Sequence, residues 1–205
     1  MDIFRDYANP HDSNRLTLSG VVKLFDLVGI DVETDIIVLY FAYLMEWKCM
    51  YVITRGELCR VIERTTWNGF NSTVKTYKDL AELIPHLRIQ LCNRDLYRAV
   101  YDYSFMYAVR AQQDSLRKRL HISTAIAMLN LFFDYPLLPS FTVYLEQVRN
   151  EDEGIRMDEW KMTFLFFESY GSSVIGFDPQ RAWPLLLCDF VSQLSAVSKK
   201  HNIQL

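Results

Sequence analysis

Apolar residues recur at helical spacing along most of this chain. In residues 19–27, Val21, Leu24 and Phe25 share one helical face, and Ser19 stands where an N-cap would accept backbone hydrogen bonds. No segment alternates apolar and polar residues for long enough to predict a strand, so the expected fold class is all-α. The patterns predict helices over residues 19–27, 32–46, 54–66, 72–92, 94–110, 123–133, 139–147, 158–169 and 183–195.

Several segments carry the signals with which helices begin. Thr54 and Glu57 have the spacing of a capping box, in which each side chain accepts a hydrogen bond from the backbone of the other. Asp158 is expected to cap the helix that follows it, and Pro184 suits the start of the last helix. The predicted helix over 32–46 is apolar almost all round, which indicates burial on most sides.

Composition agrees with a globular helical protein. Hydrophobic residues make up 50% and charged residues 23% of the chain, which rules out a disordered protein. Seven glycines and six prolines in 205 residues are too few for an all-β sandwich, which needs a turn about every ten residues. The formal net charge of −3 argues against nonspecific binding to nucleic-acid phosphates.

Cysteine usage and the first residues bear on location. The four cysteines lack the spacing of a disulfide or zinc framework, and we expect them to be reduced and packed. The opening MDIFRD does not have the pattern of a signal peptide, and the most apolar run, 36–45, is too short to cross a bilayer. These features predict a protein of the cytoplasm or nucleus. The cysteines are Cys49, Cys59, Cys92 and Cys188.

Signatures of common catalytic and cofactor sites are missing from the sequence. GxxxxGK[ST], GxGxxG, HExxH and GxSxG do not occur, and the four histidines are dispersed. We therefore expect no cofactor, no metal and no catalytic residue. A nucleophilic Cys–His pair needs only spatial proximity, so a cysteine-dependent enzyme stays open as an alternative.

Two stretches have the frame of a calcium-binding EF-hand loop. With Ile53 at the eighth loop position, Lys48 and Met50 take the third and fifth positions, where calcium needs oxygen ligands. With Leu16 at the eighth position of the stretch 9–20, a glycine takes the twelfth position and supplies no carboxylate. Both stretches therefore predict EF-hand geometry without calcium binding.

Five segments follow one another in the order and with the spacing of a known family. Together they resemble the defective-in-cullin-neddylation family, specifically its potentiating-neddylation domain. The most specific pieces are TAIAMLNL, Asp158-Glu-Trp160, and Ala182-Trp-Pro184 followed by DFV. The five segments are LTLSGVVKLFDLVGI (16–30), DIIVLYFAYLMEWKCMYVITRGEL (35–58), LHISTAIAMLNL (120–131), IRMDEW (155–160) and RAWPLLLCDFV (181–191).

The resemblance implies an all-α fold of about nine to ten helices, arranged as two EF-hand-like halves without metal-binding loops. It implies one domain over residues 10–195, with tails at 1–9 and 196–205. It also implies a function without catalysis. Such a scaffold-type co-ligase holds a cullin C-terminal domain and the acetylated N-terminus of the neddylation conjugating enzyme. We expect a monomer that binds neither nucleic acid nor membrane.

The family's binding positions fall on two sets of residues. The cullin-binding patch corresponds to Asp158, Ala182 and Cys188, where Cys188 replaces the family's aspartate and Asp189 follows it. The conjugating-enzyme pocket is an apolar cleft for an acetylated methionine, and its members from residues 38 to 45 share one helix face. Its positions fall on Val21, Val38, Phe41, Ala42, Met45, Tyr51, Ile53, Tyr107, Ala127, Met128 and Leu131.

An EF-hand-type helical adaptor with another protein partner is the alternative function. It is motivated by the changed patch at Cys188 and by pocket positions that are bulkier than, or different from, those expected of animal relatives. These positions are Phe41, Tyr51, Tyr107 and Met128.

Overall fold

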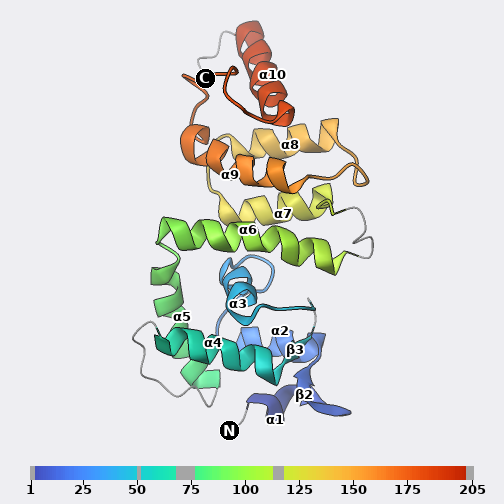
Figure 1. The fold of residues 1–205 in the computed structure, drawn as a ribbon, viewed down its shortest axis with the longest axis vertical. Helices are drawn as coiled ribbons and strands as arrows, with labels where there is room; N and C mark the ends of the chain where they lie inside the picture. The colour runs from blue at the N-terminus through green and yellow to red at the C-terminus, as the bar shows by residue number, and fades with distance from the viewer. Residues whose placement is uncertain (1–2, 50–51, 68–76, 113–117, 202–205) are drawn as a thin grey trace. The chain divides into compact units, whose positions relative to one another are not determined.

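The computed structural model describes residues 3–49, 52–67, 77–112 and 118–201 (Figure 1). Most of these residues lie in helices, which confirms the expected all-α class. The chain divides into two compact units, Met1–Gln113 and Asp114–Leu205, and each contains its own set of buried apolar side chains.

The first unit combines helices with one small sheet. Helix α3 lies between α4 and α6 (Figure 1), and most of its side chains are buried, as its apolar composition predicts. The elements are α1 (Ile3–Tyr7), β1 (Ala8–Asn9), β2 (Asp12–Leu16), α2 (Leu18–Leu27), α3 (Ile37–Met45), β3 (Ile53–Thr54), α4 (Arg55–Trp67), α5 (Tyr77–Gln90) and α6 (Arg94–Ala111).

A short antiparallel ladder joins the two stretches that have the frame of EF-hand loops. Strand β2 pairs with β1 and with β3, and Leu16 stands opposite Ile53. In the second unit, Leu120 and Ile155 form a similar bridge, with backbone hydrogen bonds of 2.7 and 2.8 Å. The pairing supports the expectation of two EF-hand-like halves. The sheet was not predicted, because strands of two to five residues are too short to show alternation.

Helix α3 begins later than its apolar pattern predicts. The Asp31 side chain accepts a hydrogen bond from the Glu33 backbone N–H at 2.8 Å. Asp35 likewise accepts one from Ile37 at 3.0 Å. Aspartate side chains that bond to the backbone two residues ahead favour turns over helix. The predicted start at residue 32 is therefore wrong, and the helix begins at Ile37.

The C-terminus of α3 is capped by two arginines of α4. Glu46 follows the helix with the left-handed angles φ 51° and ψ 47°. Arg60 Nη1 donates to the Met45 carbonyl at 2.8 Å, and Arg64 Nη1 donates to the Leu44 carbonyl at 3.0 Å. The last carbonyls of the helix, which have no partner within it, are thus satisfied by side chains.

The capping box at the start of α4 is confirmed. The Thr54 backbone N–H donates to Glu57 Oε2 at 2.8 Å, and the Glu57 backbone N–H donates to Thr54 Oγ1 at 3.2 Å. Glu57 is buried and also accepts a hydrogen bond from the Lys48 backbone N–H at 3.1 Å. The carboxylate at the twelfth loop position is therefore occupied by donors of the protein itself.

The second unit is helical and has a core rich in phenylalanine. Phe141 contacts both Phe167 and Phe190 edge to face, with ring centroids 5.4 and 5.0 Å apart. Such arrangements add to the stability that burial alone provides. The helices are α7 (Ile122–Phe132), α8 (Leu138–Val148), α9 (Met157–Tyr170) and α10 (Leu185–His201).

Three local predictions are wrong. Ser19 is not an N-cap, because α2 already includes it and Thr17 occupies the cap position. Asp158 is not an N-cap either, because it lies in the first turn of α9 and Arg156 precedes the helix. The prediction that the cysteines are packed is also wrong. All four thiols are free, but Cys188 is only half-buried and the other three, Cys49, Cys59 and Cys92, are exposed.

Some predictions fall where the structure offers no description or no test. Met50, Tyr51 and residues 72–76 of the helix predicted over 72–92 lie outside the described residues. Residues 3–9, assigned to a tail, form α1 and β1, while the domain boundaries at 10 and 195 stay predictions. None of the helices that the structure describes combines the length and hydropathy that a bilayer crossing requires.

Candidate functional site

The start of α10 presents one face outward from the second unit. Leu185 is 74% exposed, and Cys188 and Asp189 follow it three and four residues later on the same helical face. The inward face of the helix is apolar and buried, and Ala182 lies exposed just before the helix. The inward residues are Leu186, Leu187, Phe190 and Val191.

An aromatic cluster holds the segment before α10 in place. The Trp183 ring meets the Phe166 ring edge to face, with centroids 6.2 Å apart, and stacks on Phe177 at 5.7 Å. Tyr170 contacts Trp183 as well, at 6.0 Å. Because Phe166 and Tyr170 belong to α9, the exposed Ala182 stands on a packed base rather than on a free loop.

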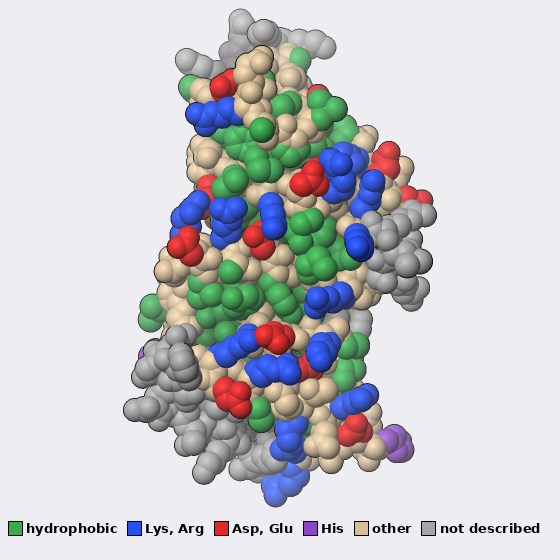
Figure 2. Space-filling view, in the orientation of Figure 1, with side chains coloured by type: hydrophobic (Ala, Val, Ile, Leu, Met, Phe, Trp, Pro, Cys, Tyr) green, Lys and Arg blue, Asp and Glu red, His purple; other side chains and the backbone are tan. Residues whose placement is uncertain are grey.

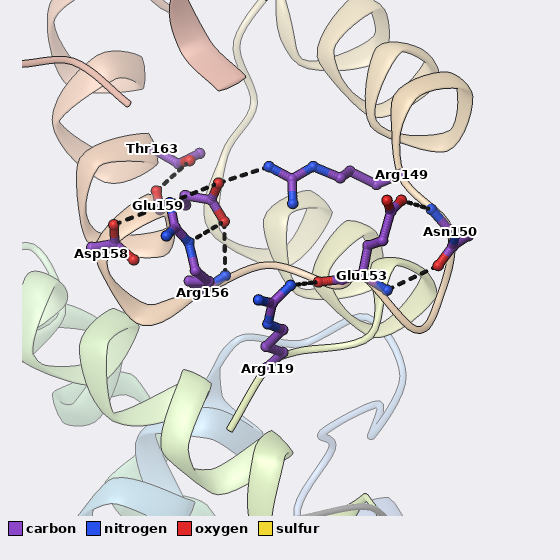
Figure 3. A network of polar contacts seen from close by, with 8 residues as sticks. All are labelled: Arg119, Arg149, Asn150, Glu153, Arg156, Asp158, Glu159 and Thr163. Atoms are coloured by element: carbon purple, nitrogen blue, oxygen red, sulfur yellow. Dashed lines mark hydrogen bonds and ion pairs between the residues drawn. The ribbon is translucent and has the colours of Figure 1, made fainter. Parts of the chain in front are cut away.

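The first turn of α9 carries the other predicted cullin-patch residue (Figure 3). The Asp158 side chain is 65% exposed, whereas the neighbouring Glu159 side chain is 2% exposed. Glu159 accepts hydrogen bonds from Arg149 Nη2 at 2.9 Å and from the Arg156 backbone N–H at 3.0 Å. The two adjacent carboxylates therefore differ in role: Glu159 is buried and hydrogen-bonded within the protein, whereas Asp158 faces solvent.

An arginine stands beside the exposed Asp158 carboxylate. Arg156 Nη2 lies 3.5 Å from Asp158 Oδ2, and Arg156 Nε lies 3.5 Å from Glu159 Oε2 (Figure 3). The Glu159 carboxylate, and then that of Asp158, raises the pKa of the Arg156 guanidinium. A basic group of a partner that approaches Asp158 thus meets a carboxylate that already has a positive neighbour.

The position of the missing aspartate is uncharged. Burial raises the pKa of the Cys188 thiol, and the adjacent Asp189 carboxylate raises it further, so the thiol holds its proton at neutral pH. Asp189 supplies a carboxylate one residue later, but one step along a helix turns its side chain by about 100°.

Asp158 and the α10 residues belong to the same unit but lie apart along α9. Phe166, which contacts Trp183, comes eight residues after Asp158, or about 12 Å along the helix axis. A standard protein interface covers about 800 Å² on each partner and can include both positions. No described hydrogen bond or ion pair joins Asp158 to the residues of α10.

In the first unit, the residues predicted for the conjugating-enzyme pocket are core residues. The Phe41 ring packs edge to face on Phe25 at 5.7 Å, and the Tyr107 ring stacks on Trp47 at 5.5 Å. Val38 is half-buried. The remaining described members are fully or almost fully buried: Val21, Ala42, Met45 and Ile53.

In the second unit, the three predicted pocket residues differ in exposure. They share α7, where Ala127 is exposed, Leu131 is half-buried and Met128 is buried. Ala127 and Leu131 are four residues apart and therefore neighbours on one helix face. These two side chains are apolar and at least partly accessible within the second unit, so they can contact a bound peptide.

A cavity that the sequence did not predict opens on the other face of α3. It has a volume of about 720 Å³, and Figure 2 shows hydrophobic side chains gathered in this region of the first unit. The Tyr40 hydroxyl donates to Gln90 Oε1 at 2.6 Å, and the Tyr103 hydroxyl donates to the Trp47 carbonyl at 3.2 Å. The lining residues are Tyr40, Tyr43, Leu44, Glu46, Glu63, Arg64, Leu96 and Tyr103.

Comparison with known proteins assigns the chain to a family. A family model described as cullin binding matches residues 79–193, more than half of the chain. The chain belongs to the cullin-binding family. The match includes all four residues of the predicted cullin patch and, of the predicted pocket, the residues from Tyr107 onward.

Curated proteins of the same family are similar over nearly the whole chain. "DCN1-like protein 4" of Drosophila melanogaster is 27% identical over 204 residues, which cover 93% of this chain and 72% of that protein. Human "DCN1-like protein 5" is 28% identical over 190 residues, which cover 92% of this chain and 73% of that protein. The family resemblance expected from the sequence motifs is thereby confirmed.

Proposed function

We propose that this chain is a scaffold-type co-ligase of cullin neddylation. It would hold a cullin C-terminal domain and the acetylated N-terminus of the neddylation conjugating enzyme in one complex. The observation that carries the cullin half is the family match over residues 79–193, which spans Asp158, Ala182, Cys188 and Asp189. Three of these residues, Asp158, Ala182 and Asp189, are exposed and Cys188 is half-buried, which supports it.

The contribution of such a scaffold is positional. Two partners held on one protein meet at a raised effective concentration, and unproductive orientations are suppressed. A protein acting in this way needs no catalytic residue of its own. This agrees with the absence of the common catalytic motifs from the sequence.

The conjugating-enzyme half rests on the uncharged side chains at the positions predicted for its pocket. An acetylated N-terminus is uncharged, whereas a free α-amino group is charged near neutral pH and costly to bury. Ala127 and Leu131 of α7 are apolar and at least partly accessible within the second unit, and the predicted α3 residues carry no charge. This chemistry favours the acetylated form of the peptide.

Titration of cullin C-terminal domains against the whole chain tests the cullin half. Ala182→Arg places a long charged side chain on an exposed position, so it is expected to abolish binding without unfolding the protein. A chain that binds no cullin, or an Ala182→Arg variant that binds as well as the wild type, would favour the adaptor alternative. The presence of Cys188 at a position where the family has an aspartate is the observation that supports this alternative.

A further inference from the structure

The face of α10 at the predicted cullin patch carries two uncharged side chains, Leu185 and Cys188, and one carboxylate, Asp189, whereas the family pattern has an aspartate in place of Cys188. Leu185 projects from the first turn with 74% of its surface exposed, and the half-buried Cys188 lies one turn further along the same face. Ala182 adds a third uncharged side chain directly before the helix. A single exposed leucine is ordinary, but this one continues into the other residues of the predicted interface.

The charges around this face are largely balanced within the protein. Arg156 stands 3.5 Å from Asp158, and Arg181 stands 4.0 Å from Asp178 in the segment before α10. Among the described residues, no ion pair involves the Asp189 carboxylate. The surface therefore presents one carboxylate that has no ion-paired arginine among the described residues, that of Asp189. Its other side chains, Ala182, Leu185 and Cys188, are uncharged.

The segments on either side of Leu185 are packed against α9. The Trp183 and Phe190 rings flank it in the chain and both pack on Phe166 of α9, with centroids 6.2 and 6.0 Å apart. An anchor side chain loses less conformational freedom on binding when its backbone is already fixed. Leu185 thus has the support expected of a contact residue rather than of a mobile surface side chain.

We propose that Leu185 is an anchor of the cullin interface, and that the native cullin partner presents an apolar surface to Leu185 and Cys188. This inference rests on the proposed function, because it takes the start of α10 as the cullin site. The expected partner is a cullin C-terminal domain with aliphatic or aromatic side chains at this contact. In the acidic-patch pattern of the family, a basic surface would stand there instead.

Titrations of the whole chain with the cullin C-terminal domains of its own organism test the inference. Leu185→Ala is expected to weaken binding about tenfold to thirtyfold, because three buried carbon groups are lost. The loss is expected to be the same at low and high salt, since an apolar contact is not screened. Leu185→Met, which nearly conserves volume, is expected to stay within about threefold of the wild type.

Two further variants serve as controls. The first tests whether any exposed aliphatic side chain would have the same effect, and the second tests whether the partner surface is apolar or basic. Ile175→Ala removes a side chain that is equally exposed, at 75%, but lies outside α10, and is expected to leave binding unchanged. Cys188→Asp would bury a carboxylate against an apolar surface and is expected to weaken binding at least tenfold. Tighter binding by Cys188→Asp would overturn the inference in favour of a basic partner surface.

The failure of this inference differs from the failure of the proposed function. If Ala182→Arg abolishes binding while Leu185→Ala stays within twofold of the wild type, the cullin site stands and the anchor is refuted. If the wild-type chain binds none of the cullin domains, the proposed function fails and the inference fails with it. Melting temperatures of all variants are expected to match that of the wild type, because the substituted side chains are exposed or half-buried.

Discussion

Glu159 shows at the scale of one residue how the second unit accommodates a buried carboxylate. It stands at the twelfth position of the loop whose eighth position is Ile155, where an EF-hand would bring a carboxylate to calcium. Here Arg149 and the Arg156 backbone N–H are its partners, at 2.9 and 3.0 Å. A guanidinium supplies the positive charge in place of a bound ion.

Arg149→Met is therefore expected to lower the free energy of unfolding by about 3 kcal/mol, because a buried carboxylate loses its charged partner. Chemical denaturation measures the change. Arg181→Met is the matched control, since that arginine and its partner Asp178 are both exposed, and it is expected to cost less than about 0.5 kcal/mol. Equal losses in the two variants would contradict the role assigned to Arg149.

Two tyrosines of the α3 cavity are expected to make the free energy of unfolding depend on pH in the alkaline range. Burial raises the pKa of Tyr40 and of Tyr103 to about 12, above the ordinary value of 10. The unfolded chain therefore releases these protons at lower pH than the folded protein. The stability they contribute is complete below pH 10 and is lost as the pH rises from 10 to 12.

A variant with Tyr40→Phe and Tyr103→Phe is expected to lose less stability than the wild type over this interval. Melting temperatures recorded from pH 9 to 12 provide the comparison, and the difference between the two proteins is the informative quantity. Parallel curves over the whole range would show that these hydroxyls do not control the alkaline transition.

Individual site residues could be predicted from the sequence where they lie within a family motif. Asp158, Ala182 and Cys188 lie in short, ordered segments of the family pattern, and the family match includes them. The α3 cavity was not predictable, because a helix that is apolar all round gives no pattern to distinguish Tyr40 and Tyr43 from core residues. The anchor at Leu185 likewise needs the structure, since exposure decides its role.

At the scale of elements, periodicity located the described long helices, and local side-chain bonds set their ends. The α4 start was predictable from the Thr54 and Glu57 pair, whereas the α3 start was missed because Asp31 and Asp35 form turns within an apolar run. Helix α1 and the three strands were missed because their length, two to five residues, is below what a period can reveal.

The loop between α3 and α4 leads to a prediction about calcium. Its twelfth-position carboxylate, Glu57, is occupied by the Thr54 and Lys48 backbone N–H groups, and Lys48 itself stands at a ligand position. Calcium is therefore not expected to raise the melting temperature. A cation binding only the folded state would add about 2.7 kcal/mol at one hundred times its dissociation constant. A rise with millimolar calcium, absent with magnesium, would contradict this prediction.

At the scale of the whole molecule, the proposed recognition of the conjugating enzyme depends on acetylation. A peptide with an acetylated N-terminus is expected to bind at least a hundredfold more tightly than its free-amine form, because burying an ammonium group costs several kcal/mol. Calorimetry of the two peptides against the whole chain measures the difference, and equal affinities would end this account. Ala127→Arg places a long charged side chain on an exposed position of α7 and is expected to abolish peptide binding, with circular dichroism to verify that the variant folds.

The central claim is that one chain brings the two partners together to speed transfer. Its most direct test is the single-turnover rate of modifier transfer from the loaded, acetylated conjugating enzyme to a cullin C-terminal domain of the same organism. The wild-type chain is expected to raise this rate, and Ala182→Arg, which blocks the exposed cullin position while leaving the fold intact, is expected to return it to the rate without the chain. A rate that the wild-type chain leaves unchanged, or that Ala182→Arg raises equally, would contradict the account.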